Sequence, residues 1–162
     1  MFNIVLVNPK IHTNTGSIGR MCVNSGAKLH LIKPLGFEID DKHLRRAGLD
    51  YWASLEPIIW ESLEDFLEVN LEFKDRFFFA TTKCNKLYFD AKFAPGDYLI
   101  FGAEDCGLPI ELMKLNKNNC ITIPMTNQGR SLNLATSVGI ITYEAIRQNV
   151  DKFDFRDSVC EF

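Results

Sequence analysis

The chain has 162 residues, of which 46% are hydrophobic and 24% charged, a composition typical of a globular domain with one sizeable core. Its net charge of −3 argues mildly against a general nucleic-acid binder, and no apolar run has the length of a membrane span. The five cysteines form no CxxC pair, which disfavours a disulfide framework or a zinc site and favours a reducing, cytoplasmic setting.

Short apolar runs rich in β-branched and aromatic residues predict six strands. They lie at residues 2–7, 29–32, 57–60, 76–82, 97–102 and 120–125. The runs are close to continuously apolar, as are strands that are buried on both faces of a parallel sheet. No basic region precedes the first run and no small-residue cleavage site follows it, so we interpret it as a strand and not as a signal peptide.

Amphipathic stretches between these strands predict five helices. They lie at residues 17–26, 40–52, 62–73, 109–116 and 131–148. Gly26 suits the end of the first helix, Ser62 the N-cap of the third and Pro109 the first turn of the fourth. Alternating strands and helices predict an α/β fold around a parallel sheet, with one domain over residues 1–150. We assign no role to the tail, residues 151–162.

Several common catalytic motifs are missing from the sequence. No GxGxxG follows the first strand, and neither GxxxxGK[ST] nor GxSxG occurs. The three histidines, at positions 12, 30 and 43, lack metal-ligand spacing, so no metal is expected, and we interpret His30 as a structural residue of its strand. These absences disfavour most hydrolases, kinases and redox enzymes.

The loop after the first strand, "NPKIHTNTGSIGR" at residues 8–20, places small polar residues just before the expected helix. Backbone N–H groups at a helix start near Asn14, Thr15 and Gly16 suit an anion such as phosphate. Arg20, one turn inside that helix, has the guanidinium geometry to bind a phosphate. Taken alone, this loop favours the simpler interpretation, a helix N-cap with a surface arginine.

Two further loops follow later strands. In "FGAEDCGLP", residues 101–109, Gly102 and Gly107 permit close backbone approach or positive φ, while Glu104 is either a cap or a solvated acid. An acid beside the thiol of Cys106 also raises the question of nucleophilic chemistry. In "IPMTNQGRSLNLATS", residues 123–137, either Ser131 or Asn133 caps the last helix.

Ligands of an open parallel sheet collect at the carboxyl ends of its strands, where these three loops lie. Together they offer backbone amides, small residues and apolar edges, with few titratable groups. Such a pocket suits a neutral or zwitterionic ligand that carries a purine.

The motifs "NTGSIGR", "FGAEDCGLP" and "IPM…RSLNLATSVGIITYEA" resemble, in order and spacing, those of SPOUT-class RNA 2′-O-methyltransferases. "GFEIDDKHLRRAGLDYW" and "TTK" are similar to segments of the bacterial tRNA (cytidine/uridine-34-2′-O)-methyltransferases. The resemblance covers roughly residues 1–149. It implies an α/β sheet with a C-terminal deep trefoil knot, a homodimer, the cofactor S-adenosylmethionine and, as substrate, the wobble nucleotide in the anticodon stem-loop of tRNA.

The resemblance also implies roles for particular residues. The cofactor would bind Ala80, Thr81, Gly102, Ile123, Met125, Ser131 and Leu132, chiefly through backbone groups. Asn14, Arg20, Glu104 and Asn133 would face the reacting ribose or support that loop, and Arg45 and Arg46 in the basic cluster "KHLRRAG" would lie toward the tRNA. Arg20 is a poor base while charged, so we expect it mainly to hold the phosphate and the 2′-oxygen.

Two features depart from the family pattern: Cys106 replaces another polar or basic residue, and the tail has no clear counterpart. We interpret Cys106 as a local substitution, because methyl transfer to a hydroxyl needs no covalent intermediate. Three other functions remain open: methylation of another RNA such as rRNA, a non-enzymatic RNA-binding knot module, and a flavodoxin-type nucleotide-binding oxidoreductase, which would lack a suitable phosphate loop.

Overall fold

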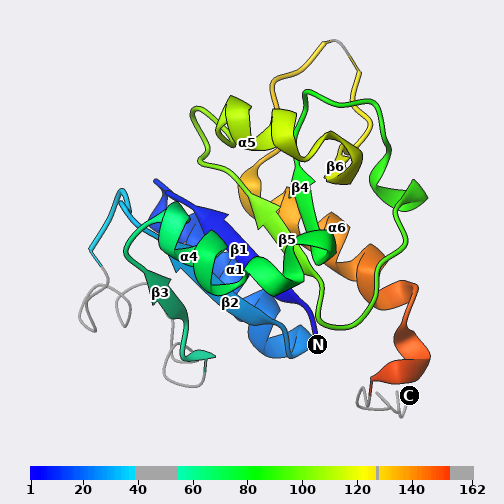
Figure 1. The fold of residues 1–162 in the computed structure, drawn as a ribbon, viewed down its shortest axis with the longest axis horizontal. Coiled ribbons are helices and arrows are strands. Elements are labelled where there is room, and N and C mark those ends of the chain that lie inside the picture. The colour runs from blue at the N-terminus through cyan, green and yellow to red at the C-terminus, as the bar shows by residue number, and fades with distance from the viewer. Residues whose placement is uncertain (39–54, 127, 154–162) are drawn as a thin grey trace, which may run out of the picture.

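The computed structural model describes residues 1–38, 55–126 and 128–153, in which six parallel strands form one sheet (Figure 1). The strand order is β3-β2-β1-β5-β4-β6. The strands are β1 (Asn3–Val7), β2 (Lys28–Ile32), β3 (Ile58–Trp60), β4 (Phe77–Ala80), β5 (Tyr98–Phe101) and β6 (Cys120–Ile121). Every strand pairing is parallel, which confirms the predicted α/β fold with a parallel sheet.

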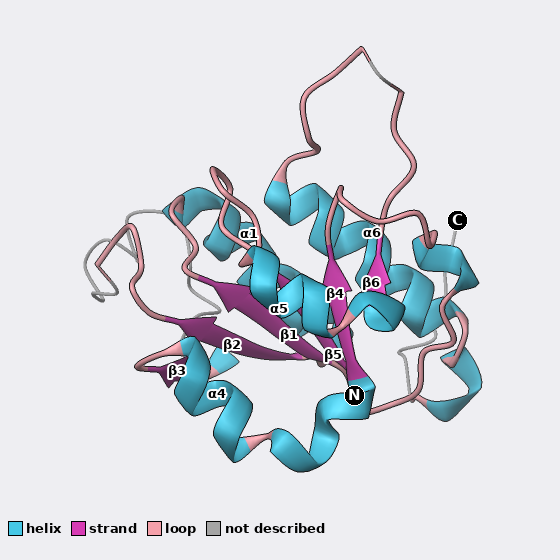
Figure 2. Ribbon diagram, turned by 45° about the horizontal axis from the view of Figure 1, so that its top comes forward, coloured by secondary structure: helices cyan, strands magenta, loops and turns pink. Residues whose placement is uncertain are grey.

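Helices cover both faces of the sheet, as Figure 2 shows. The α-helices are α1 (His12–Ser25), α4 (Leu63–Val69), α5 (Ile110–Leu115) and α6 (Leu134–Arg147), and the 3₁₀ helices are η1 (Leu71–Arg76), η2 (Tyr88–Asp90), η3 (Lys117–Asn119) and η4 (Val150–Lys152). Helices α1 and α6 pack against each other on one face, while α4 and α5 contribute to the core on the other. The helix predicted at residues 40–52 lies outside the described residues.

Strand β1 shows why the predicted strands are apolar throughout. Ile4 and Leu6 join the core under α1 and α6, while Val5 and Val7 join the core under α4 and α5. All four side chains are almost completely buried. Alternate side chains of a strand point to opposite faces, so a strand covered on both sides needs no polar face. In the described part of the chain, no helix is long and apolar enough to cross a bilayer.

Two predicted helix ends are confirmed at the level of single hydrogen bonds and angles. The Oγ atom of Ser62 accepts a hydrogen bond from the backbone N–H of Asp65 at 3.0 Å, which caps α4. Gly26 ends α1 in the left-handed conformation, with φ of 65°.

The structure also corrects three predicted boundaries. Helix α1 starts at His12 and not at residue 17, so Asn14 lies inside it. Strand β6 ends at Ile121 and not at residue 125, because the backbone of Thr122 bonds to Lys86 and Tyr88 in place of β4. The helix predicted to reach residue 73 ends after Val69: the buried side chain of Asn70 donates to the Phe66 carbonyl and accepts from the Tyr98 hydroxyl, and η1 follows.

His30 is a structural residue, as predicted. Its Nδ1 accepts a hydrogen bond from Nε1 of Trp60 at 3.1 Å, and its Nε2 lies 3.3 Å from Oδ1 of Asn3. Because an indole N–H can only donate, the imidazole is neutral with its proton on Nε2. Burial, and to a smaller extent the nearby charge of Lys28, lower the pKa of His30 to about 4.

Candidate active site

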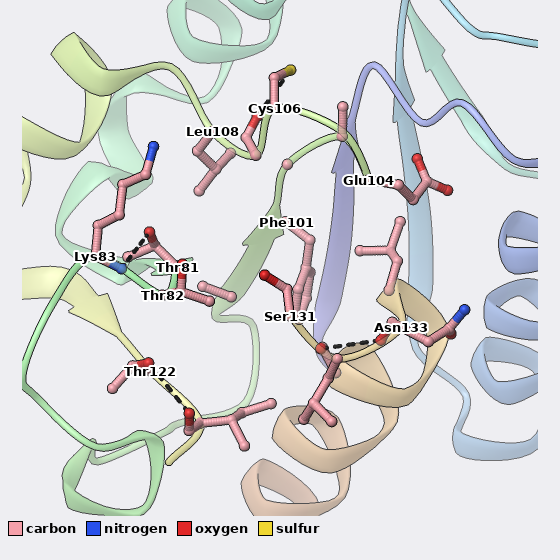
Figure 3. A pocket seen from close by; sticks show the side chains of 18 of the residues that line it. Thr81, Thr82, Lys83, Phe101, Glu104, Cys106, Leu108, Thr122, Ser131 and Asn133 are labelled. Atoms are coloured by element: carbon pink, nitrogen blue, oxygen red, sulfur yellow. Dashed lines mark hydrogen bonds between the residues drawn. The ribbon is translucent and has the colours of Figure 1, made fainter. Parts of the chain in front are cut away.

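A cavity of about 990 Å³ lies at the carboxyl ends of β4, β5 and β6. Its walls come from residues 80–83 at the end of β4, residues 101–108 after β5, residues 121–123 and 125, and residues 129–134 leading into α6 (Figure 3). Because all strands run parallel, their carboxyl ends share one edge, and the loops predicted to form a site meet there.

The loop after β5 folds back on itself tightly. The backbone N–H of Gly107 donates to the carbonyl of Ala103 at 2.8 Å. A Cβ atom added to Gly102 would lie 2.1 Å from the carbonyl carbon of Gly107, and Gly107 itself has φ of 72°. Gly102 is therefore required by the close approach of two backbone segments, and Gly107 by its positive φ.

This fold-back presents the carboxylate of Glu104 to the start of α1. Its Oε2 accepts from the backbone N–H of Lys10 at 2.8 Å, and its Oε1 accepts from the N–H of Ile11 at 3.2 Å and from Nδ2 of Asn14 at 2.9 Å. Ile11, the N-cap residue of α1, has no side-chain cap of its own. The helix macrodipole favours negative charge at this position, so Glu104 acts as a cap supplied by a distant loop.

Asn14 connects this cap to the start of α6. Its Oδ1 accepts from Nδ2 of Asn133 at 2.9 Å, and Oδ1 of Asn133 accepts from the backbone N–H of Thr136 at 3.2 Å. Asn133 is thus the cap of α6, one of the two residues the sequence offered. The structure brings three of the four predicted catalytic residues, Asn14, Glu104 and Asn133, into one hydrogen-bonded chain, which we call the loop junction.

The loop junction decides between two interpretations of the first loop. One of them, which the loop alone did not favour, was a helix start open to an anion such as phosphate near Asn14, Thr15 and Gly16. All three residues are buried within the helix, and the carboxylate of Glu104 takes the anion position at its N-terminus. A phosphate bound there would have to displace a carboxylate from its hydrogen bonds.

All seven predicted cofactor residues line the cavity: Ala80, Thr81, Gly102, Ile123, Met125, Ser131 and Leu132. Met125 and Leu132 remain 40% and 39% exposed, so a bound ligand could cover their apolar side chains. Among the described residues, no hydrogen bond engages the backbone N–H of Met125 or Leu132. Neutral side chains and available backbone groups fit S-adenosylmethionine, which combines a purine with charged groups.

The fourth predicted catalytic residue, Arg20, lies elsewhere. It is an exposed residue of α1 and is not among the residues that line the cavity. Arg45 and Arg46, predicted to lie toward the tRNA, are outside the described residues.

Two cations on the cavity wall were not singled out from the sequence. Lys83 follows Thr81, whose Oγ1 accepts the backbone N–H of Lys83 at 3.1 Å, and Arg130 lies in the loop before α6. Figure 3 shows Lys83 on the side of the cavity opposite Glu104. The resemblance includes Lys83 in "TTK" but assigns it no role. The sequence therefore pointed to this segment without identifying Lys83 as a site residue.

Cys106 lies exposed on the loop after β5. A hydrogen bond with Asp105 raises the pKa of the Cys106 thiol and lowers the pKa of the Asp105 carboxyl. A raised pKa disfavours the thiolate, which is the nucleophilic form. The microenvironment therefore gives no support to nucleophilic chemistry at Cys106.

Comparison with known proteins identifies the family. Residues 1–143 match the model of the SpoU rRNA Methylase family. The chain is 48% identical over 149 residues to the tRNA (cytidine(34)-2′-O)-methyltransferase of Aeromonas hydrophila, covering 91% of this chain and 94% of that one.

Two solved structures share both fold and sequence with this chain. A candidate RNA methyltransferase from Bacillus anthracis superposes with a TM-score of 0.88 at 39% identity, covering 100% of both chains. A protein solved in a study of the 2-OH methylation of C/U34 on tRNA gives a TM-score of 0.83 at 40% identity, covering 93% of this chain and 97% of that one. The chain belongs to the SpoU methylase family and has its α/β SPOUT fold.

Proposed function

We propose that this protein transfers a methyl group from S-adenosylmethionine to the ribose 2′-hydroxyl of nucleotide 34 of tRNA, a cytidine or a uridine derivative. The observation that carries the proposal is the near full-length match to a tRNA (cytidine(34)-2′-O)-methyltransferase, combined with a cavity lined by every expected cofactor residue. A tRNA substrate also favours a cytoplasmic location.

Bound S-adenosylmethionine would supply an electrophilic methyl group. Thr81, Ile123, Met125 and Leu132 would hold it through backbone groups and apolar side chains at the cavity wall. Alignment of two bound reactants is worth roughly 7–11 kcal/mol of the barrier, so these residues act chiefly by positioning.

The loop junction would hold the reacting ribose against this pocket. Asn14 and Asn133 bring amide groups to the cavity lining, and Glu104 keeps both amides and the start of α1 in place. Glu104 already accepts three hydrogen bonds, which favours a positioning role over proton transfer.

Arg20 retains its predicted role, which is to hold the phosphate next to the ribose and the 2′-oxygen. Arg20 is exposed on α1, so it can contact the reacting nucleotide only if the RNA extends to it or if a second protomer places it beside the cavity. The variant Arg20→Ala is expected to reduce the rate of methyl transfer strongly. Its affinity for S-adenosylmethionine, measured by calorimetry, should be unchanged. Transfer at the wild-type rate would remove Arg20 from the mechanism.

The proposal includes a homodimer and a C-terminal knot within a single domain of residues 1–150. Support for the dimer is the family resemblance, with Val23 on α1 and Tyr143 on α6 exposing apolar surface on two helices that pack together. For the knot, α6 follows the edge strand β6 yet packs against β5 and α1 near the middle of the sheet. Sedimentation equilibrium at micromolar concentration tests the dimer.

Transfer of labelled methyl groups to bulk tRNA, followed by mapping of the modified nucleotide, tests the function. Label at the ribose of nucleotide 34 is the expected result. Label in rRNA and none in tRNA would instead support the alternative substrate. If millimolar S-adenosylmethionine produces no heat of binding, the protein would be a non-enzymatic module.

A further inference from the structure

Two stretches of the chain that build the cavity contain no acidic residue. Residues 77–89 and 112–143 include Lys83, Lys86, Lys114, Lys117 and Arg130 but no Asp or Glu, in a chain with 18 Lys and Arg against 21 Asp and Glu. The first stretch contains β4 and the loop after it, and the second contains η3, β6, the loop after β6 and most of α6. The excess of acid therefore lies elsewhere in the molecule.

The fold brings these two stretches side by side. The backbone N–H of Thr122 donates to the carbonyl of Lys86 at 2.9 Å, and the N–H of Tyr88 donates to the carbonyl of Thr122 at 2.9 Å. The ammonium group of Lys86 donates to the backbone carbonyl of Asn118 in η3 at 3.1 Å. Because Asn118 directly follows Lys117, this hydrogen bond holds Lys86 of the first stretch near Lys117 of the second.

Three of the lysines carry charge that no acid among the described residues compensates. Lys83, Lys86 and Lys117 are exposed, and no carboxylate of a described residue lies within ion-pair distance of them. Lys114 differs, because its ammonium group pairs with Glu111 at 2.8 Å. We call Lys83, Lys86 and Lys117 the lysine flank.

The lysine flank is continuous with the cavity. Lys83 lines the cavity wall, Lys86 follows it in the same loop, and Lys117 precedes Asn118, whose carbonyl accepts a hydrogen bond from Lys86. The opposite wall carries Glu104 and Asp105. An anionic chain whose reacting unit enters the cavity would therefore be attracted toward the lysine flank and away from the opposite wall.

We propose that the lysine flank binds the phosphate backbone of the RNA whose ribose is methylated in the cavity. The inference rests on the proposed function and adds a surface for the substrate, made of residues other than the basic cluster of the sequence at positions 42–48. The ammonium group of a lysine is a compact charge that suits contacts with phosphates and does not recognise particular bases. This surface would therefore contribute to the affinity for RNA and to its position on the protein more than to selection of a sequence.

The test is the salt dependence of tRNA binding by the double variant Lys86→Gln/Lys117→Gln. Each phosphate contact that is lost lowers the slope of log K against log salt by roughly 1 and weakens binding at every sequence alike. We expect a slope smaller by about 1.5–2 and binding weaker by on the order of tenfold at 0.1 M salt. Calorimetric affinity for S-adenosylmethionine and the unfolding temperature should stay unchanged.

The matched control is Lys28→Gln/Lys152→Gln, which removes the same charge at the other end of the sheet. Lys28 begins β2, and Lys152 precedes Phe153, whose ring contacts Phe2. This control should keep the wild-type slope.

An unchanged slope in the Lys86/Lys117 variant of an enzyme that methylates tRNA would overturn the lysine flank and leave the proposed function intact. An equal fall in slope for the control would show an effect of net charge alone and would also overturn it. Failure of the wild-type protein to methylate tRNA would instead contradict the proposed function.

Discussion

Two polar clusters in this molecule use similar hydrogen bonds in different surroundings. Asn3, His30 and Trp60 join β1, β2 and β3 inside the sheet, while the loop junction of Asn14, Glu104 and Asn133 joins three segments beside a cavity. The first cluster is neutral and surrounded by aromatic rings, including those of Phe66 and Tyr98, each within 6 Å of the imidazole centroid.

The loop junction carries a carboxylate and lines the same cavity as exposed apolar side chains such as Met125. Buried polar groups are normally hydrogen-bonded wherever they occur, so a satisfied cluster is not by itself a sign of function. What distinguishes the loop junction is its position on a cavity wall at the carboxyl edge of a parallel sheet. The variants below separate the two clusters by their effects on activity and on stability.

The largest effect is expected for Glu104→Ala, which leaves two backbone N–H groups and the Asn14 amide without their acceptor. We expect methyl transfer to fall by on the order of 100-fold, because small displacements of aligned groups have effects of this size. The free energy of unfolding should fall by about 2–3 kcal/mol, as expected when hydrogen bonds to a charged group are lost.

Glu111→Ala is the control for this variant, since it removes an exposed carboxylate from a surface ion pair with Lys114. Such pairs contribute little, so rate and stability should stay close to wild type. Glu104→Ala with wild-type turnover would show that the loop junction, like the His30 cluster, serves packing alone.

The His30 cluster should affect stability and its pH dependence. The folded state holds the pKa of His30 at about 4, below the ordinary value of 6.5, so the unfolded state binds more protons between these values. Neutral His30 therefore contributes about 3 kcal/mol to the free energy of unfolding above pH 6.5, and this contribution is lost as the pH falls toward 4. Urea unfolding across this range should show a weaker pH dependence in His30→Gln than in wild type.

The control is His12→Gln, which removes an exposed histidine outside this cluster. If His30→Gln kept the wild-type pH dependence, the imidazole of His30 would titrate normally and the neutral hydrogen-bonded assignment would be wrong.

A smaller effect is expected for Asn133→Ala, which removes the cap of α6 and the contact with Asn14. Loss of a cap costs about 1 kcal/mol in the free energy of unfolding. Since the two asparagines share a hydrogen bond, the double variant with Asn14→Ala should be less destabilised than the sum of both single changes. Strict additivity would mean that the two residues act independently.

The smallest effect is expected for Cys106→Ser on the loop after β5. The side chain is exposed, its pKa is raised by Asp105, and its replacement should change stability by no more than about 0.5 kcal/mol. Methyl transfer should stay within twofold of wild type. Abolished turnover with intact cofactor binding would reopen a chemical role for the thiol.

Most of the fold could be predicted because its signals are local. Apolar runs of strand length, a serine before α4 and a glycine after α1 each act within a few residues. Boundaries were less predictable where a distant partner intervenes: Asn70 ends α4 through its contact with Tyr98, which lies 28 residues further along the chain.

The site, like the fold, was predicted in part. The resemblance located the cavity residues and three members of the loop junction, but it grouped Arg20 with them although Arg20 is not among the residues that line the cavity. It also left the lysine flank unrecognised, because its members come from two stretches that only strand pairing brings together.

The sequence by itself determined which segments form strands and helices and which loops follow the strands, since hydrophobic periodicity and capping residues act over short range. Only the tertiary structure decided which of those loops form hydrogen bonds with one another. Glu104 is about 90 residues from the helix it caps, and Asn133 is 119 residues from Asn14. Hydrogen bonds over such separations depend on the order of strands in the sheet, which no local pattern specifies.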